Sequence, residues 1–269
     1  MDLLGYSFFQ NALLGVILTG IVTGILGSYI VVRRMVFISG GITHSSFAGL
    51  GFGFMIGQSP ILYAMLSAIL SGIGVEALSR RGTVRSDSAI ATVWSFGMAL
   101  GVLFTFLTPG YTPGLSAFLF GNILLITGAD LWMLSIFLLV TIPLVILLYH
   151  PLLYVSFDPD YARTRGLPVS LYSYAMMVWI CIGIVLSIRV MGIMMLMSML
   201  TLPQMTVNLF TSDFKKILSL SCLLSVLATL AALFCSYYLN LPTGAVSVLL
   251  LSVLFFASRG VLFLKNKRA

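Results

Sequence analysis

Long stretches of apolar residues recur along almost the whole chain, and this pattern constrains the fold more than any other feature. Each stretch is long enough for a helix to cross about 30 Å of hydrocarbon. The sequence therefore predicts an all-α, polytopic transmembrane helical bundle of about eight to nine spans. One stretch contains Pro203 and could be broken there, which leaves the count open by one. The stretches lie near residues 6–32, 39–57, 60–79, 88–107, 130–149, 168–188, 190–211, 216–238 and 243–263.

Composition excludes a water-soluble domain. Hydrophobic residues make up 60% of the chain and charged residues only 8%, too few to cover a surface that faces water. The first apolar stretch is too long for the core of a secretory signal, and no positive residue precedes it, so we expect it to stay in the mature chain. One transmembrane domain over residues 1–269 is the simplest interpretation. The cysteines, Cys181, Cys222 and Cys235, stand singly in apolar stretches and indicate core packing.

Basic residues cluster at the ends of the apolar stretches and predict the orientation of the chain. The net charge of +7 comes from small groups that anchor helices at the membrane surface, a pattern that argues against nucleic-acid binding. If these groups are cytoplasmic, the N-terminus lies outside and the C-terminus inside. Arg189 alone departs from this alternation, and we expect it to snorkel or to face a water-filled path. An outward-facing re-entrant or interfacial segment is expected at about residues 115–128.

A dense group of charged residues, FDPDYARTRGLPV at 157–169, lies between two apolar stretches. It predicts a short cytoplasmic helix at about 158–166, because Ser156 or Asp158 can cap its start, Pro159 suits its first turn, and Gly166 ends it. Such an element suits docking of a water-soluble partner. The residues assigned to this contact are Asp158, Asp160, Tyr161, Arg163, Arg165 and Gly166.

His44 lies in SGGITHSSFAGLGFG, a segment at 39–53 made mainly of small residues. Small residues let helix backbones approach closely or leave room for a path. We therefore assign Ser39, Gly40, Thr43 and Ser45 to an interior pathway. The imidazole is either a hydrogen-bonded packing residue or a ligand suited to zinc, manganese or iron. In a twofold symmetric dimer, two copies of His44 would supply half of a tetrahedral site.

Other polar residues have structural interpretations. Glu76 is placed to pair with Arg80, and Asp87, Asp130 and Asp213 are placed to begin helices. His150 is expected at the membrane interface, and the methionines at 191–199 suit core packing better than copper binding. No phosphate-binding loop, GxSxG or HExxH motif occurs, so no catalytic residue is assigned and the chain is not expected to be an enzyme.

Several ordered motifs resemble the permease subunit of bacterial ATP-binding-cassette importers for zinc, manganese or iron, the ABC-3 metal permeases. They are FDPDYARTRGLPV, SDSAIATVWSFGMALGV at 86–102, LFGNILLIT followed by Asp130, and VMGIMMLMSMLTLPQMT at 190–206. The resemblance implies a type II importer fold in the bacterial cytoplasmic membrane and a homodimeric pathway in contact with membrane lipid. It also implies two separate ATPase subunits that clasp the 158–166 coupling helix, and an extracytoplasmic metal-binding protein. No permanently bound cofactor is implied, since the metal is cargo.

One position departs from the family pattern. The family motif resembles GDxLSH, with an aspartate four residues before the histidine, and Gly40 occupies that position here. A site of two aspartates and two histidines therefore cannot be carried over, and His44 remains without a carboxylate partner. Iron, copper or a metal chelate stay open as cargo. An ion-coupled secondary carrier and a structural or regulatory membrane protein are the other classes left open.

Overall fold

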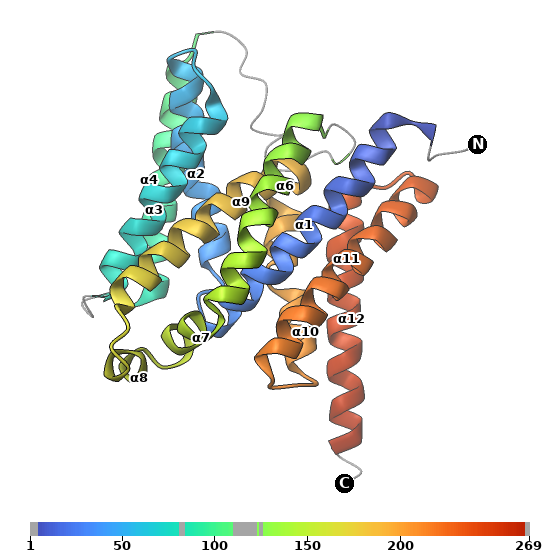
Figure 1. Cartoon of the computed structure of the whole chain (residues 1–269). Coiled ribbons are helices and arrows are strands. Elements are labelled where there is room, and N and C mark those ends of the chain that lie inside the picture. The colour runs from blue at the N-terminus through green and yellow to red at the C-terminus, as the bar shows by residue number, and fades with distance from the viewer. Residues whose placement is uncertain (1–4, 81–83, 110–122, 124–125, 267–269) are drawn as a thin grey trace. The chain divides into compact units, whose positions relative to one another are not determined.

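The computed structural model of the chain is built from α-helices, which agrees with the predicted fold class (Figure 1). It describes residues 5–80, 84–109, 123 and 126–266. Most of the expected re-entrant segment at 115–128 lies outside these described residues. In chain order the helices are α1 (Ser7–Val32), α2 (Ile38–Met55), α3 (Pro60–Arg80), α4 (Ser86–Leu107), α6 (Gly128–Leu147), α7 (Tyr149–Phe157), α8 (Pro159–Thr164), α9 (Val169–Met199), α10 (Leu202–Asn208), α11 (Phe214–Leu239) and α12 (Thr243–Asn266).

Within the described residues, seven helical segments are long and apolar enough to cross a membrane. The predicted count of eight to nine spans is therefore not confirmed. One difference concerns α2, which has 18 residues rich in Gly, Ser and Thr and is not among the seven. The other concerns the stretches at 168–188 and 190–211, which form a single candidate segment, Val169–Asn208.

The merged segment is irregular at two points. Gly192 adopts φ 72° and ψ 170° inside α9, a conformation open to glycine and strained for other residues. After α9 ends at Met199, the chain turns, and α10 begins with Pro203 in its first turn. Of the two possibilities that the sequence left open, the helix is broken just before Pro203, because proline suits a helix start and not a helix interior.

The chain divides into two compact units. The first contains residues 1–31, 116–136 and 187–269, and the second contains residues 32–115 and 137–186. The boundaries fall near the end of α1 and inside α6 and α9. Whether the whole chain acts as one domain stays a prediction.

In the first unit, α1 packs tightly against α11 and α10. A Cβ atom added at Gly24 would lie 2.5 Å from the Cα atom of Cys222, and one added at Gly20 would lie 3.1 Å from that of Val226. Buried Gln204 on α10 donates its side-chain amide to the carbonyl oxygen of Thr23, at 3.0 Å. Small residues thus let the backbones approach, and a buried amide fixes the crossing.

In the second unit, α2 lies between α3 and α4 (Figure 1). The approach is close on both sides: a Cβ at Gly49 would collide with the carbonyl group of Tyr63, and one at Gly97 would collide with the backbone of Ser45. Cys181 on α9 is buried and would collide with a Cβ at Gly72 on α3. Core packing is confirmed for Cys181, whereas Cys235 on α11 is exposed on the chain.

Candidate functional site

The small residues of α2 make a helix that is buried over most of its length. Ser39, Gly40, Thr43 and Ser45, the residues assigned to the pathway, are all buried. The prediction that this segment lets helix backbones come close is confirmed by its packing against α3 and α4. Their role in a metal path stays a prediction.

The hydroxyl groups of α2 donate to carbonyl oxygens of the chain's own backbone. Ser39 donates to Val36 at 2.8 Å, and Ser45 donates to Ile42 at 3.1 Å. Thr43 donates to the carbonyl oxygen of Ser39. The hydrogen of each of these hydroxyls is therefore already used. What remains on the oxygen is its lone pairs, which can bind a cation.

His44 is half-buried on α2, and its ring stacks on the indole of Trp94 from α4. The ring centroids are 4.6 Å apart and the planes differ by 6°. Phe47 lies on the same side of α2, with its ring centroid 6.0 Å from that of His44. The Nδ1 atom of His44 is buried and has no hydrogen-bond partner among the described residues. The imidazole is therefore held by aromatic packing, and its Nδ1 atom is left without a hydrogen-bond partner among the described residues.

Within the part of the chain that the structure describes, no three His, Cys, Asp or Glu side chains gather around a point suited to a metal ion. Gly40, one helical turn before His44, supplies no side chain. One copy of the chain therefore offers a single imidazole among the described residues of this region, and more ligands would have to come from a second copy, from water, from the α2 hydroxyls or from backbone oxygens.

The charged segment forms the short helix that its residues predict. Asp158 is the N-cap: its Oδ1 accepts from the backbone N–H of Asp160 at 3.1 Å and of Tyr161 at 2.9 Å. Pro159 occupies the first turn. The predicted range of about 158–166 includes both caps, while α8 itself runs from Pro159 to Thr164.

The end of α8 is a Schellman motif. Gly166 has φ +75° and donates its N–H to the carbonyl oxygen of Arg163 at 2.9 Å, and Leu167 donates to that of Ala162 at 3.1 Å. The left-handed conformation explains the glycine. Ala162 is fully buried against Val155 and Val169, with Leu167 packed on this cluster. One face of α8 is thus fixed to the ends of α7 and α9.

The opposite face of α8 carries exposed charges. The side chains of Asp160 and Arg163 are 88% and 58% exposed, and they form an ion pair with each other. The Tyr161 hydroxyl accepts a hydrogen bond from Nε of Arg165 at 2.9 Å, and this bond raises the pKa of Arg165 above its usual value. Exposed ion pairs of this kind are worth about 0 to 1 kcal/mol, so a docked partner can replace them at little cost.

The acidic residues largely follow expectation, with one correction. Asp213 caps α11 by accepting from the N–H of Lys215 at 3.0 Å, as predicted. Glu76 does not pair with Arg80. It is buried on α3 and lies 3.2 Å from Arg33, while Arg80 donates to the hydroxyl of Ser170. The longer-range pair wins because Arg33 approaches the buried face of α3 on which the carboxylate lies.

Two further residues, one in each unit, gain a role that sequence reasoning did not assign. Trp94 lies in the stretch 86–102 that carries the family resemblance, but its contact with His44 depends on how α2 and α4 pack. Arg189, the exception to the charge alternation, forms an ion pair with Asp130, which also begins α6 as predicted. Two signals for these contacts were available in the sequence. One was a tryptophan on a helix expected near the one that carries His44, and the other was a pair of opposite charges, on two helices, without other partners.

The class of protein follows from comparison with known families. The model of the ABC 3 transport family matches residues 5–261, and the chain belongs to this family. With its apolar helices, it is a multi-pass membrane protein of the ABC-transporter permease type.

Individual relatives are similar over nearly their full lengths. The chain is 31% identical over 271 residues to the manganese transport system membrane protein MntC of Listeria monocytogenes, which covers 98% of this chain and 96% of that one. It is 34% identical over 254 residues to the manganese import system permease protein ScaB of Streptococcus parasanguinis, and this match covers 94% of this chain and 90% of ScaB. Among solved structures, PsaBC from Streptococcus pneumoniae in complex with Fab matches with a TM-score of 0.83 and 29% identity, covering 95% of this chain and 92% of that chain.

Proposed function

We propose that the chain is the membrane-spanning subunit of an ATP-driven importer of a divalent transition metal, manganese or zinc. Two copies form the translocation pathway, and two ATPase subunits supply the energy. An extracytoplasmic metal-binding protein delivers the ion. Family membership supports the class, and the names of MntC and ScaB favour manganese over zinc.

The observation that carries this proposal is the structure of α8, with its two caps, its buried face and its exposed charged face. This helix is capped at both ends, is fixed by buried Ala162, and presents Asp160, Tyr161 and Arg163 to water. A rigid, charged element between two membrane helices transmits movement from a soluble partner. Closure of the ATPase pair on ATP moves α8, and the helices joined to it switch the open side of the pathway. The alternation of the basic groups along the sequence supports a cytoplasmic side for α8 and the C-terminus and an outer side for the N-terminus.

His44 is the metal contact in this proposal. Its free, buried Nδ1 and the pairing of two copies across a twofold axis give two imidazole ligands. Water, the lone pairs of the α2 hydroxyls or backbone oxygens complete the shell. Without a carboxylate at position 40, the site holds metal weakly, which suits conduction because the ion must also leave.

The class is tested by purifying the chain from its host in mild detergent. We expect an ATP-binding-cassette ATPase to co-elute and its ATP hydrolysis to rise when the permease is present. Transport by the isolated chain, without any ATPase, would instead identify an ion-coupled carrier. Absence of both partner and flux would contradict the proposal.

The ligand role is tested with His44→Ala in vesicles that contain the full transporter, by measuring uptake of manganese and of zinc. We expect uptake to fall at least tenfold while the ATPase still co-elutes. The matched control is His150→Ala, which removes the exposed histidine at the start of α7. Uptake that is unchanged by His44→Ala would remove the ligand role and leave the class of protein intact.

A further inference from the structure

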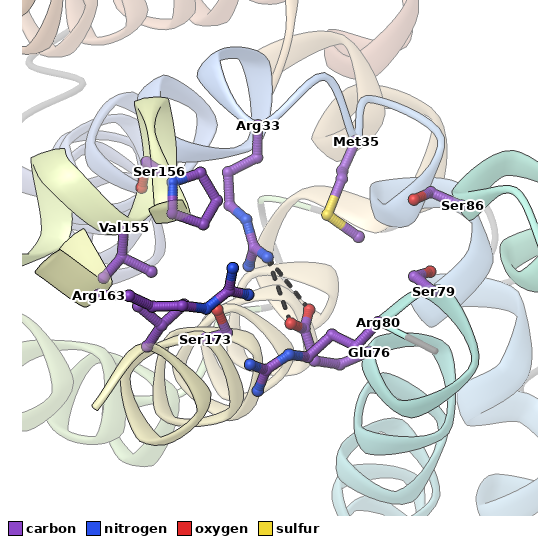
Figure 2. A pocket seen from close by; sticks show the side chains of 12 residues that line it. Arg33, Met35, Glu76, Ser79, Arg80, Ser86, Val155, Ser156, Arg163 and Ser173 are labelled. Carbon is purple, nitrogen blue, oxygen red and sulfur yellow. Dashed lines mark hydrogen bonds and ion pairs between the residues drawn. The ribbon is translucent and has the colours of Figure 1, made fainter. Parts of the chain in front are cut away.

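The second unit contains a polar cavity beside α8 that the transport cycle does not explain (Figure 2). Its volume is about 310 Å³, at the lower end of the range for small-ligand sites. The walls come from the segment after α1, the end of α3, the start of α4, and α7, α8 and α9. It thus lies where the coupling helix meets the rest of its unit.

Positive charge exceeds negative charge in the wall of this cavity. Arg33, Arg80 and Arg163 line it, and Glu76 is the one carboxylate among its lining residues. Arg33 and Glu76 form the ion pair drawn in Figure 2, so the charges of Arg80 and Arg163 are not balanced within the cavity. Arg163 also pairs with Asp160, but that carboxylate is 88% exposed and screened by water.

Two buried donors at the cavity have no partner among the described residues. They are Nη1 of Arg33 and Oγ of Ser79. Leaving such groups unpaired is unfavourable, most of all for a charged group. Serines from three further helices also line the cavity: Ser86, Ser156 and Ser173. A ligand with several acceptor oxygens and negative charge would pair with the arginine and serine groups that face the cavity.

We propose that the cavity binds a phosphate group, which bridges Arg163 of α8 to Arg33 and Arg80. The planar guanidinium group of arginine can donate two parallel hydrogen bonds to the oxygens of a phosphate, and serine hydroxyls add neutral donors. The chemistry is the same for a free phosphate ion and for the headgroup of an anionic phospholipid, and basic pockets between membrane helices bind such headgroups. Occupancy would join α8 to α3 and stiffen the element that receives force from the ATPase.

The test uses the purified full chain and measures its thermal unfolding midpoint during titration with inorganic phosphate, against chloride at equal ionic strength. We expect a saturable rise. Arg80→Gln should raise the half-saturating phosphate concentration about tenfold, since it removes a charged hydrogen bond to the phosphate. Arg80 is exposed and carries no buried ion pair, so the variant should fold. Arg259→Gln makes the same change on α12, which contributes no lining residue to the cavity, and should titrate like the natural chain.

A second arm identifies the source of the phosphate. The same variants are placed in phosphatidylcholine or phosphatidylglycerol nanodiscs, and their unfolding midpoints are compared. A higher midpoint in phosphatidylglycerol that Arg80→Gln removes supports a lipid headgroup, whereas saturation by inorganic phosphate alone supports a free ion. Equal responses of Arg80→Gln and the natural chain in both arms would overturn the proposal, because phosphate also stabilises proteins non-specifically.

Discussion

Nε of Arg189 on α9 lies 3.0 Å from Oδ1 of Asp130 at the start of α6. The Asp130 side chain is 7% exposed, and its other oxygen accepts from the backbone N–H and the hydroxyl of Thr127, at 3.1 and 2.6 Å. Arg189 is the basic residue that breaks the charge alternation along the chain. Its charge is neutralised locally by the carboxylate of Asp130.

The losses from removing the two members of this pair should not add. Arg189→Gln leaves a buried carboxylate without its counter-ion, and we expect a loss of about 2 kcal/mol in the free energy of unfolding. Asp130→Asn should cost a similar amount, and the double variant clearly less than the sum. Thermal unfolding in detergent measures all three, and strictly additive losses would show that the pair does not interact.

Close packing of α2 predicts a contrast between two glycines. Gly49→Ala places a methyl group against the carbonyl group of Tyr63, which is backbone and cannot rotate away. We expect a loss of about 1 to 3 kcal/mol. Gly74→Ala on α3 is the matched control, because no atom lies within 4 Å of its added Cβ, and it should stabilise the helix by up to about 1 kcal/mol. Equal unfolding midpoints for the two variants would contradict the close approach.

Local features of the fold could be predicted from the sequence, and contacts between distant segments could not. The caps of α8 depend on Asp158, Pro159 and Gly166, which act on backbone groups within a few residues. The partner of Glu76 is 43 residues away, and the local alternative, Arg80, has the correct helical spacing. Only the tertiary packing distinguishes the two.

The same distinction applies to the candidate metal path. The run of small residues around His44 predicts a buried seam, because residue size is local information. The stacking of His44 on Trp94 depends on the register between α2 and α4, which a single sequence does not contain. Pro203 made a boundary between α9 and α10 partly predictable from the sequence. The kink at Gly192 was not predictable, because a glycine allows the unusual backbone angles but does not require them.

Removing the N-cap of α8 should weaken its coupling to the ATPase, and two variants of Asp158 separate the effect of the cap from the effect of the charge. Asp158→Ala removes the acceptor for two backbone N–H groups and should destabilise α8 by about 1 kcal/mol. We expect weaker stimulation of the ATPase by the permease. Asp158→Ser keeps an oxygen acceptor without the charge and should retain most of the stimulation. If Asp158→Ser is as defective as Asp158→Ala, the carboxylate acts through its charge on the ATPase and not as a cap.

Restoring a carboxylate beside His44 should change how the path holds metal. Gly40 lies one helical turn before His44, so Gly40→Asp adds oxygen ligands on the same face of α2. Carboxylates suit manganese, and we expect tighter manganese binding and slower release, with a lower half-saturating concentration and a lower maximal uptake rate. Gly40→Asn adds nearly the same volume without charge and controls for crowding in this buried helix. Identical uptake kinetics for the aspartate and asparagine variants would show that position 40 does not face the ion.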